Sequence, residues 1–219
     1  VDHGKTTLVD AMLKQSYVFR DNQKIGNLIM DSNELERERG ITILAKNTAI
    51  TYDQIKINII DTPGHADFSG EIERVINMAD GVLLVVDAVE GVMPQTEIVL
   101  KQALRKLLKP IVVINKIDRP SARPAYVLNM VQDLFLELAV DPDQLDFTVL
   151  YAAANEGYAI SDLSDTPESI KPLFEAIKNE IPHPRGKTDF PFQLQVASLD
   201  YDLHLGQIAI GRILNGEVS

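Results

Sequence analysis

Residues 81–118 read GVLLVVDAVEGVMPQTEIVLKQALRKLLKPIVVINKID, and this stretch decides the fold. The runs GVLLVVDA at 81–88 and KPIVVINK at 109–116 are short, rich in β-branched residues and almost continuously apolar. That composition is typical of strands in a parallel sheet that is covered on both faces. Between them, QTEIVLKQALRKLL at 95–108 has the periodicity of an amphipathic helix. The stretch therefore predicts a strand, a helix and a second strand, in the order of an α/β domain.

The same alternation continues on both sides of this stretch. Apolar runs predict further strands at 56–61 and 147–154. Helical periodicity predicts helices at 8–15, 68–79, 125–140 and 167–181. Together these elements predict a doubly wound, mostly parallel α/β domain over residues 1–182.

The sequence changes in character after Ile181. Residues 183–189 lie in a stretch rich in proline and polar residues, which is the composition of a linker. FQLQVASLDYD at 192–202 and GQIAIGRILNGEV at 206–218 then alternate apolar and polar side chains. We therefore expect residues 190–219 to form the first strands of a second domain, a β-barrel that continues past the given sequence.

Composition excludes several classes of protein. The 219 residues include no cysteine, so disulfide scaffolds and thiolate metal sites are excluded. Domains that wrap nucleic acid are usually basic, so the formal net charge of -11 disfavours direct wrapping of nucleic acid by this chain. No apolar run approaches the ~18 residues of a membrane-spanning helix, and we expect no membrane association. The first residue is Val1 rather than methionine, so we expect the natural chain to begin earlier.

DHGKTT at 2–7 has the residue types of a phosphate-binding loop that leads into a helix. Gly4 allows the backbone to approach a phosphate, and the following helix N-terminus supplies positive potential. Lys5 can reach the β- and γ-phosphates, and the Thr6 hydroxyl can bind Mg²⁺. Taken alone, these residues are equally compatible with an ordinary helix start. The residues that we assign to nucleotide binding here are Asp2, His3, Gly4, Lys5, Thr6 and Thr7.

NIIDTPGHADF at 58–68 contains the end of the predicted strand at 56–61 and the turn that follows it. Asp61, at the end of the strand, can hold Mg²⁺ through a water molecule. The Gly64 backbone N–H can approach a γ-phosphate. His65, next to such a site, could position the water that attacks the phosphate.

VVINKID at 112–118 supplies the features of a guanine site. The Asp118 carboxylate can accept two hydrogen bonds from guanine, and adenine lacks the matching pair of donors; such a site can reject the wrong base by roughly 10⁴-fold. Asn115 would brace the neighbouring loops, and the stem of Lys116 would stack on the base. All three motifs stand, in this order, where open α/β sheets bind ligands. They predict a P-loop NTPase fold that binds GTP or GDP with Mg²⁺.

These motifs resemble those of the translational GTPases. ERERGITI at 36–43 resembles their switch I, DTPGHADF at 61–68 their switch II, and GRILNGEV at 211–218 a motif of their second domain. MDSNELERERGITILAKNTAI at 30–50 is most similar to the TypA/BipA family of ribosome-associated GTPases. The resemblance extends along essentially the whole chain.

The resemblance implies further roles. Thr42 would close on Mg²⁺ and the γ-phosphate, and it joins Lys5 and His65 as a catalytic residue. Val1 and Ile41 would form a hydrophobic gate beside His65, until the sarcin–ricin loop of the ribosome draws the histidine inward. Asp2 would bind a monovalent cation and order that contact with ribosomal RNA.

One loop departs from the family pattern. YAAAN at 151–155 has Ala153 where the family usually has a serine. The resemblance implies that the backbone N–H of Ala154 contacts the base, with Asn155 beside it. Without the serine, we expect guanine affinity to be modestly weaker.

We therefore expect a monomeric, ribosome-stimulated GTPase that converts GTP to GDP and phosphate and acts in translation or ribosome assembly. We expect it in the bacterial cytoplasm or, as a homologue, in a plastid. One alternative is another translational GTPase, similar to elongation factor G or elongation factor 4. A second is a nucleotide-dependent binding scaffold with little turnover. Because the strand before the phosphate-binding loop is absent, we expect this segment by itself to fold or bind nucleotide poorly.

Overall fold

The computed structural model describes residues 2–16, 46–62, 69–184, 186–202 and 204–218. The predictions for Val1, Ile41, Thr42, Gly64 and His65 concern residues outside these ranges. None of the described helices combines the length and the apolar character that crossing a membrane requires.

The central sheet has the strand order β3 (Gly81–Asp87), β4 (Lys109–Asn115), β5 (Thr148–Ala153) and β6 (Tyr158–Ile160). β3, β4 and β5 are parallel, and the short β6 pairs antiparallel with β5. Residues 81–87 pair with 109–115 along their full length. The predicted strands are thus confirmed, and the sheet is mixed but mostly parallel.

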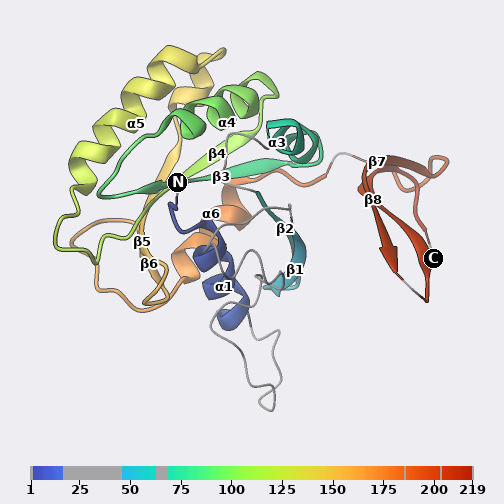
Figure 1. Ribbon diagram of the computed structural model, residues 1–219, viewed down its shortest axis with the longest axis horizontal. Helices are drawn as coiled ribbons and strands as arrows, with labels where there is room; N and C mark the ends of the chain where they lie inside the picture. Colours follow the sequence, from blue (N-terminus) through green and yellow to red (C-terminus); the bar gives the residue numbers. More distant parts are fainter. Residues whose placement is uncertain (1, 17–45, 63–68, 185, 203, 219) are drawn as a thin grey trace.

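Helices cover both faces of this sheet, as the apolar character of its strands predicts. In β4, the buried Ile111 and Val113 pack in one core cluster with α1 (Lys5–Gln15) and α6 (Lys171–Glu180). The alternate residues Val112 and Ile114 pack in a second cluster with α4 (Pro94–Arg105) and α5 (Pro124–Leu138). Figure 1 shows the two helix pairs on opposite sides of the sheet. The predicted doubly wound α/β fold is confirmed.

Proline positions set the starts of three helices. Pro94 and Pro124 are the first residues of α4 and α5, where a missing N–H costs no helical hydrogen bond. A helix starting at residue 167 would place Pro172 in its interior. The helix begins instead at Lys171, so Pro172 falls in the first turn, and the predicted start was four residues too early.

A separate hairpin precedes the central sheet in the chain. β1 (Lys46–Tyr52) pairs antiparallel with β2 (Ile55–Asp61) through a two-residue turn. Asp53 and Gln54 in this turn both have positive φ, 48° and 64°, as a type I′ turn requires. The strand at 56–61 was predicted as part of a mostly parallel sheet, but it pairs antiparallel, and β1 was not predicted. Asp-Gln is a weaker hairpin signal than Asn-Gly, which is why the pairing was not evident.

An apolar cavity of about 890 Å³ lies between the hairpin and the central sheet. It is lined by side chains from α1, β2, α3 (Ser69–Ile76), β3, α4 and α6. Among the described residues, β2 pairs only with β1, and β3 only with β4. Within the described ranges, each of these two strands therefore has one edge without a partner strand, and both strands line the cavity.

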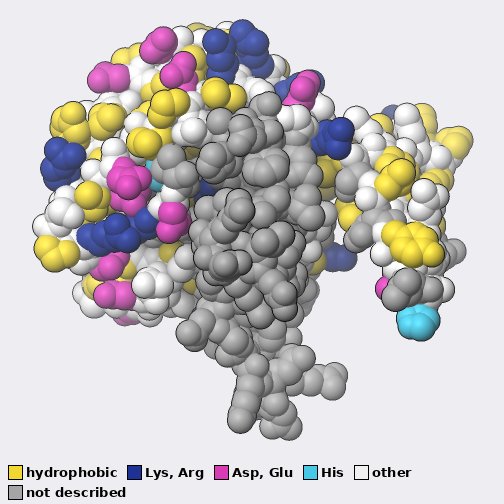
Figure 2. Space-filling view, in the orientation of Figure 1, with side chains coloured by type: hydrophobic (Ala, Val, Ile, Leu, Met, Phe, Trp, Pro, Cys, Tyr) yellow, Lys and Arg dark blue, Asp and Glu magenta, His cyan; other side chains and the backbone are white. Residues whose placement is uncertain are grey.

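The C-terminal part forms a second hairpin of β7 (Gln193–Asp202) and β8 (Gly206–Asn215), with irregular register near Val196. It projects to one side of the α/β layers (Figure 1). The Arg212 guanidinium joins it to the segment before β3, donating to the carbonyls of Met78 (3.0 Å) and Ala79 (3.1 Å) and to Asp80. Large apolar side chains are exposed on this hairpin (Figure 2). The strands agree with the predicted alternation, and the barrel itself stays a prediction.

Candidate nucleotide-binding site

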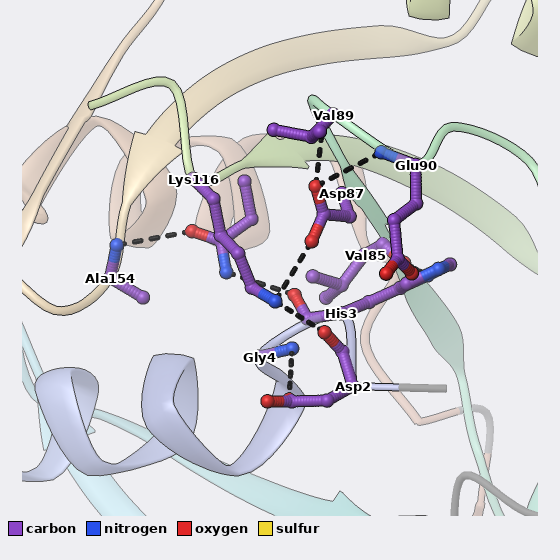
Figure 3. Close-up of polar contacts among 10 residues, drawn as sticks. Asp2, His3, Gly4, Val85, Asp87, Val89, Glu90, Lys116 and Ala154 are labelled. Atoms are coloured by element: carbon purple, nitrogen blue, oxygen red, sulfur yellow. Dashed lines mark hydrogen bonds and ion pairs between the residues drawn. The ribbon is translucent and has the colours of Figure 1, made fainter. Parts of the chain in front are cut away.

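The loop at residues 2–4 lies against the C-terminal ends of β3 and β4 (Figure 3). Gly4 caps α1 with φ 81° and ψ 30°, and its N–H donates to Asp2 Oδ1 at 3.0 Å. A Cβ at Gly4 would lie 2.5 Å from Asn115 Nδ2 and 3.6 Å from Lys116 Cε. Glycine is therefore required twice here, for the left-handed backbone and for the close approach to the loop after β4.

Asn115 joins three loops through its side chain. It is the last residue of β4 and is 1% exposed. Its Nδ2 donates to the His3 carbonyl at 3.0 Å, and its Oδ1 accepts from the Ala154 N–H at 3.1 Å. The amide thus holds the loop at 2–4 and the loop after β5 in fixed positions relative to β4.

This arrangement bears on the predicted base contact of Ala154. Because the Ala154 N–H donates to Asn115, a guanine oxygen at this position would share that donor. Ala153 is fully buried, and Asn155 is exposed at the rim of the loop. The small side chain of Ala153 therefore belongs to the core, which leaves the backbone as its route to a nucleotide.

Lys116 follows Asn115 in a left-handed conformation, with φ 65°. Its ammonium contacts Asp87 Oδ2 at 2.8 Å and donates to the carbonyl of Asp2. Asp118, the predicted guanine ligand, is exposed two residues farther on. The turn after β4 therefore holds the Lys116 side chain against the loop at 2–4 and carries the exposed carboxylate of Asp118.

Two of the predicted magnesium ligands, Thr6 and Asp61, lie together at the end of β2. The Thr6 hydroxyl, in the first turn of α1, donates to Asp61 Oδ2 at 2.7 Å, and Asp61 is buried. A hydroxyl and a carboxylate are the oxygen ligands that Mg²⁺ takes when phosphates and water complete its octahedron. The described residues contain no group of three His, Asp or Glu side chains that could hold a metal alone. The pair thus fits a metal that arrives with a phosphate ligand.

Lys5 precedes Thr6 and is partly buried. Burial lowers the pKa of its ammonium, while Asp61 and Asp2 act in the opposite direction. A cation whose charge is poorly solvated gains more from an anionic ligand than a fully hydrated one does. Thr7, which follows Thr6, is half-buried on α1. The charge of Lys5 therefore suits contact with a phosphate.

His3 has its buried ring against the central sheet. Its Nδ1 donates to the Val85 carbonyl of β3 at 3.1 Å. Burial lowers the pKa of the imidazole, so the ring is neutral near pH 7. His3 contributes to the loop through its carbonyl, which accepts from Asn115, while its ring packs on β3.

The sequence analysis missed one buried acid in this site. Asp87 ends β3, is buried and contacts Lys116. The rule that singled out Asp61, a carboxylate at the C-terminal end of an apolar strand, applies equally to the final Asp of GVLLVVD.

Comparison with known proteins gives this geometry a family. The family described as the elongation factor Tu GTP binding domain matches residues 1–183. The chain belongs to this family.

Relatives of this GTP-binding domain carry the names that the sequence analysis expected. The large ribosomal subunit assembly factor BipA of Synechocystis is 60% identical over 218 residues, which is 100% of this chain and 36% of the relative. A putative elongation factor TypA-like protein SVR3, chloroplastic, of Arabidopsis thaliana is 58% identical and covers 99% of this chain and 32% of the relative. BipA of Escherichia coli K12 is 56% identical over the whole chain. The resemblance to TypA/BipA is thus confirmed, and the chain spans about a third of these relatives (36% and 32%).

A solved structure also shares the fold. The crystal structure of a bacterial selenocysteine-specific elongation factor, EF-Sec, superposes with a TM-score of 0.75 at 25% identity. The match covers 100% of this chain and 34% of that one. Because it includes the C-terminal hairpin as well as the α/β layers, the similarity extends over both parts of the chain.

Proposed function

We propose that this chain is the nucleotide-binding part of a ribosome-stimulated GTPase of the TypA/BipA type, which hydrolyses GTP to GDP and phosphate. The observation that carries the proposal is the Asn115 amide, which joins the loop at 2–4 to the loop after β5. In this proposal the loop at 2–4 binds the phosphates and the loops after β4 and β5 bind the base, and the junction supports that reading because one hydrogen-bonded network connects all three loops. The relatives named as ribosomal subunit assembly factors support the ribosome as the activating partner.

In this proposal, each described residue has a defined task. Lys5 binds the β- and γ-phosphates, and Asp118 accepts from the guanine edge. Thr6 and Asp61 hold Mg²⁺, Thr6 directly and Asp61 through water; the metal neutralises charge that develops on the phosphates. The side chain of Asp2 already accepts from the Gly4 N–H through Oδ1, which leaves Oδ2 for a monovalent cation.

The hydrolytic part of the proposal concerns residues outside the described ranges. His65 positions the attacking water, Thr42 closes on the metal and γ-phosphate, and Val1 and Ile41 gate the histidine. The sarcin–ricin loop draws His65 into place. These roles rest on the resemblance to the translational GTPases, and measurement of GTP hydrolysis tests them directly.

The organisation and location of the protein are part of the same proposal. Residues 1–182 form the GTP-binding domain, 183–189 the linker, and 190–219 the start of a β-barrel domain. The protein acts as a monomer in a bacterial cytoplasm or in a plastid, in line with bacterial and chloroplastic relatives. A factor similar to elongation factor G or 4, and a scaffold with little turnover, are the competing functions.

The test is steady-state GTP hydrolysis by the full-length protein, with and without 70S ribosomes. Ribosomes should stimulate turnover, and His65→Ala should reduce it by roughly 10²-fold or more, as expected for a group acting on the attacking water. His204→Ala, at an exposed site on the C-terminal hairpin, is the matched control and should leave turnover unchanged. Stimulation that survives His65→Ala would refute the catalytic role, and binding without turnover would favour the scaffold.

A second experiment addresses the metal. Thr6→Ala should raise the Mg²⁺ concentration needed for half-maximal hydrolysis, because it removes a ligand. Thr6→Ser keeps the hydroxyl and should behave like the parent protein. An equal Mg²⁺ requirement in all three proteins would exclude Thr6 as a metal ligand.

A further inference from the structure

We propose that Asp87 is a positioning residue for the guanine nucleotide, and that it acts through Lys116. The inference rests on the proposed GTP-binding function and adds to it a residue outside the three motifs. Asp87 touches no nucleotide in this scheme. It holds the ammonium of Lys116 so that the aliphatic stem lies in one place beside the base.

The carboxylate of Asp87 is fixed from both sides. Oδ1 accepts from the backbone N–H groups of Val89 at 2.7 Å and Glu90 at 3.3 Å. These bonds orient the group within the turn that follows β3 (Figure 3). Oδ2 is thereby aimed at Lys116 Nζ, 2.8 Å away. The side chain is 1% exposed, so water competes little for the pair.

Ionisation of Asp87 is favoured despite its burial. Burial by itself would raise the pKa of the carboxyl group. The ion pair with Lys116 and the backbone hydrogen bonds from Val89 and Glu90 outweigh that cost and keep the pKa below its ordinary value. The group is therefore a carboxylate at neutral pH and a charged acceptor for the lysine.

Lys116 connects this carboxylate to the phosphate-binding loop. Its ammonium also donates to the carbonyl of Asp2, and its Cε lies 3.6 Å from the position of a Cβ at Gly4. The stem consequently crosses from β4 to the loop at 2–4 along a single path. The lysine side chain is 15% exposed, so most of its surface is already packed in this position.

Loss of the carboxylate would release this arrangement. A released lysine side chain regains rotamer entropy, and one carbonyl acceptor holds it less firmly than a carbonyl and a charge together. A base that stacks on the stem would then have to order the side chain upon binding. The expected consequence is faster release of nucleotide rather than slower encounter.

The test measures dissociation of a fluorescent GDP derivative from the full-length protein by stopped flow. Asp87→Asn keeps the size of the side chain and should release GDP about 10- to 100-fold faster, the range expected for a lost charged hydrogen bond. Asp80→Asn makes the same chemical change at the other end of β3, where the acid pairs with Arg212. This control should release GDP at the parental rate.

A double-mutant cycle shows whether the effect passes through Lys116. Lys116→Met retains an apolar stem without the ammonium and should itself accelerate release. In that background, Asp87→Asn should add less than about twofold, because the coupled partner is already gone. A dissociation rate constant does not depend on the fraction of folded protein, so a purely structural role of Asp87 would not produce this coupling.

The outcomes separate this inference from the proposed function. If the parent protein binds no GDP, the nucleotide function fails and this inference fails with it. If the parent binds GDP and Asp87→Asn releases it at the parental rate, only the role of Asp87 is overturned. The same holds if Asp87→Asn accelerates GDP release by the same factor in the parent and in the Lys116→Met background. If Asp87→Asn does not fold, Lys116→Met decides alone, and an unchanged rate in that variant overturns the inference.

Discussion

Replacement of Gly4 by alanine should weaken GDP binding severely, and the structure allows the size of the effect to be worked out. Gly4 has φ 81°, a region that alanine enters at a cost of about 1–2 kcal/mol. The new Cβ would also lie 2.5 Å from Asn115 Nδ2, which is closer than atoms of this kind approach. Asn115 would have to withdraw from the His3 carbonyl, its acceptor at 3.0 Å.

The two costs add because they have different origins. A buried neutral hydrogen bond contributes about 1 kcal/mol, so the sum is about 2–3 kcal/mol. The loop can relieve this strain by leaving the left-handed turn, and GDP must then restore the turn upon binding. The strain therefore shows as lost affinity, about 30- to 150-fold in Kd.

Fluorescence titration of the full-length protein with labelled GDP measures this loss, and two other glycines provide matched controls. Gly206 has φ 78°, and no atom lies within 4 Å of the position that a Cβ would take, so Gly206→Ala carries the backbone cost without a clash. Gly70 lies in α3 with open space and no positive φ. Both controls should keep the parental Kd within about twofold, since neither borders the loop at 2–4. A Kd for Gly4→Ala within about threefold of the parent would refute the reasoning.

Three further predictions concern His3, Arg212 and the apolar cavity. Burial lowers the pKa of the His3 imidazole, so the unfolded chain takes up a proton below about pH 6.5 that the folded chain refuses. Stability should therefore fall as the pH drops through about 6.5, and it should fall less in His3→Asn. Equal losses of stability in thermal unfolding of the two proteins would contradict this. Arg212→Met removes hydrogen bonds from a charged donor, which are worth about 1.5–3 kcal/mol each. Proteolysis in the 183–192 segment should therefore accelerate about tenfold or more. An unchanged proteolysis rate would show that the guanidinium does not hold the C-terminal hairpin against the segment before β3. An apolar, β-branched segment fused before Val1 should raise the midpoint of thermal unfolding more than a Gly/Ser segment of equal length does. The reason is that the apolar segment can enter the cavity of about 890 Å³ and pair with the edges of β2 and β3. Equal unfolding midpoints for the two fusions would contradict this.

Secondary structure could be predicted where burial imposes a single pattern. The strands at 81–87 and 109–115 are buried on both faces, so their residues are apolar almost without interruption. β1 was missed because its residues, KNTAITY, include an asparagine and an alanine and follow neither pattern strictly. β6 has only three residues, too few to show any period. Both strands owe their existence to a neighbouring strand rather than to their own composition.

The candidate site was predictable to a similar degree. Several residues of the site were predicted because each motif places a particular residue type next to a strand or helix end. They are Gly4, Lys5, Thr6, Asp61 and Asn115. Asp87 was overlooked because one acid at the end of an apolar run has no motif around it. The pairing of Asp87 with Lys116 could be recognised only in the structure, where β3 and β4 are adjacent strands.

The amino-acid sequence was enough to identify the candidate side chains and their order along the chain: a Gly-Lys-Thr loop, an acid at the end of an apolar strand and an Asn-Lys-Ile-Asp turn. Only the tertiary structure decided which side chains meet. Thr6 reaches Asp61 across 55 residues, and Asn115 reaches the His3 carbonyl across 112. The Asn115 contact depends on the register of β3 and β4, which puts the C-terminal ends of these parallel strands side by side, and on the left-handed backbone at Gly4 and Lys116. In a hairpin such as β1–β2 the turn fixes the register, whereas the register of the parallel strands β3 and β4, which are joined by a long crossover, is set by packing between segments distant in the chain.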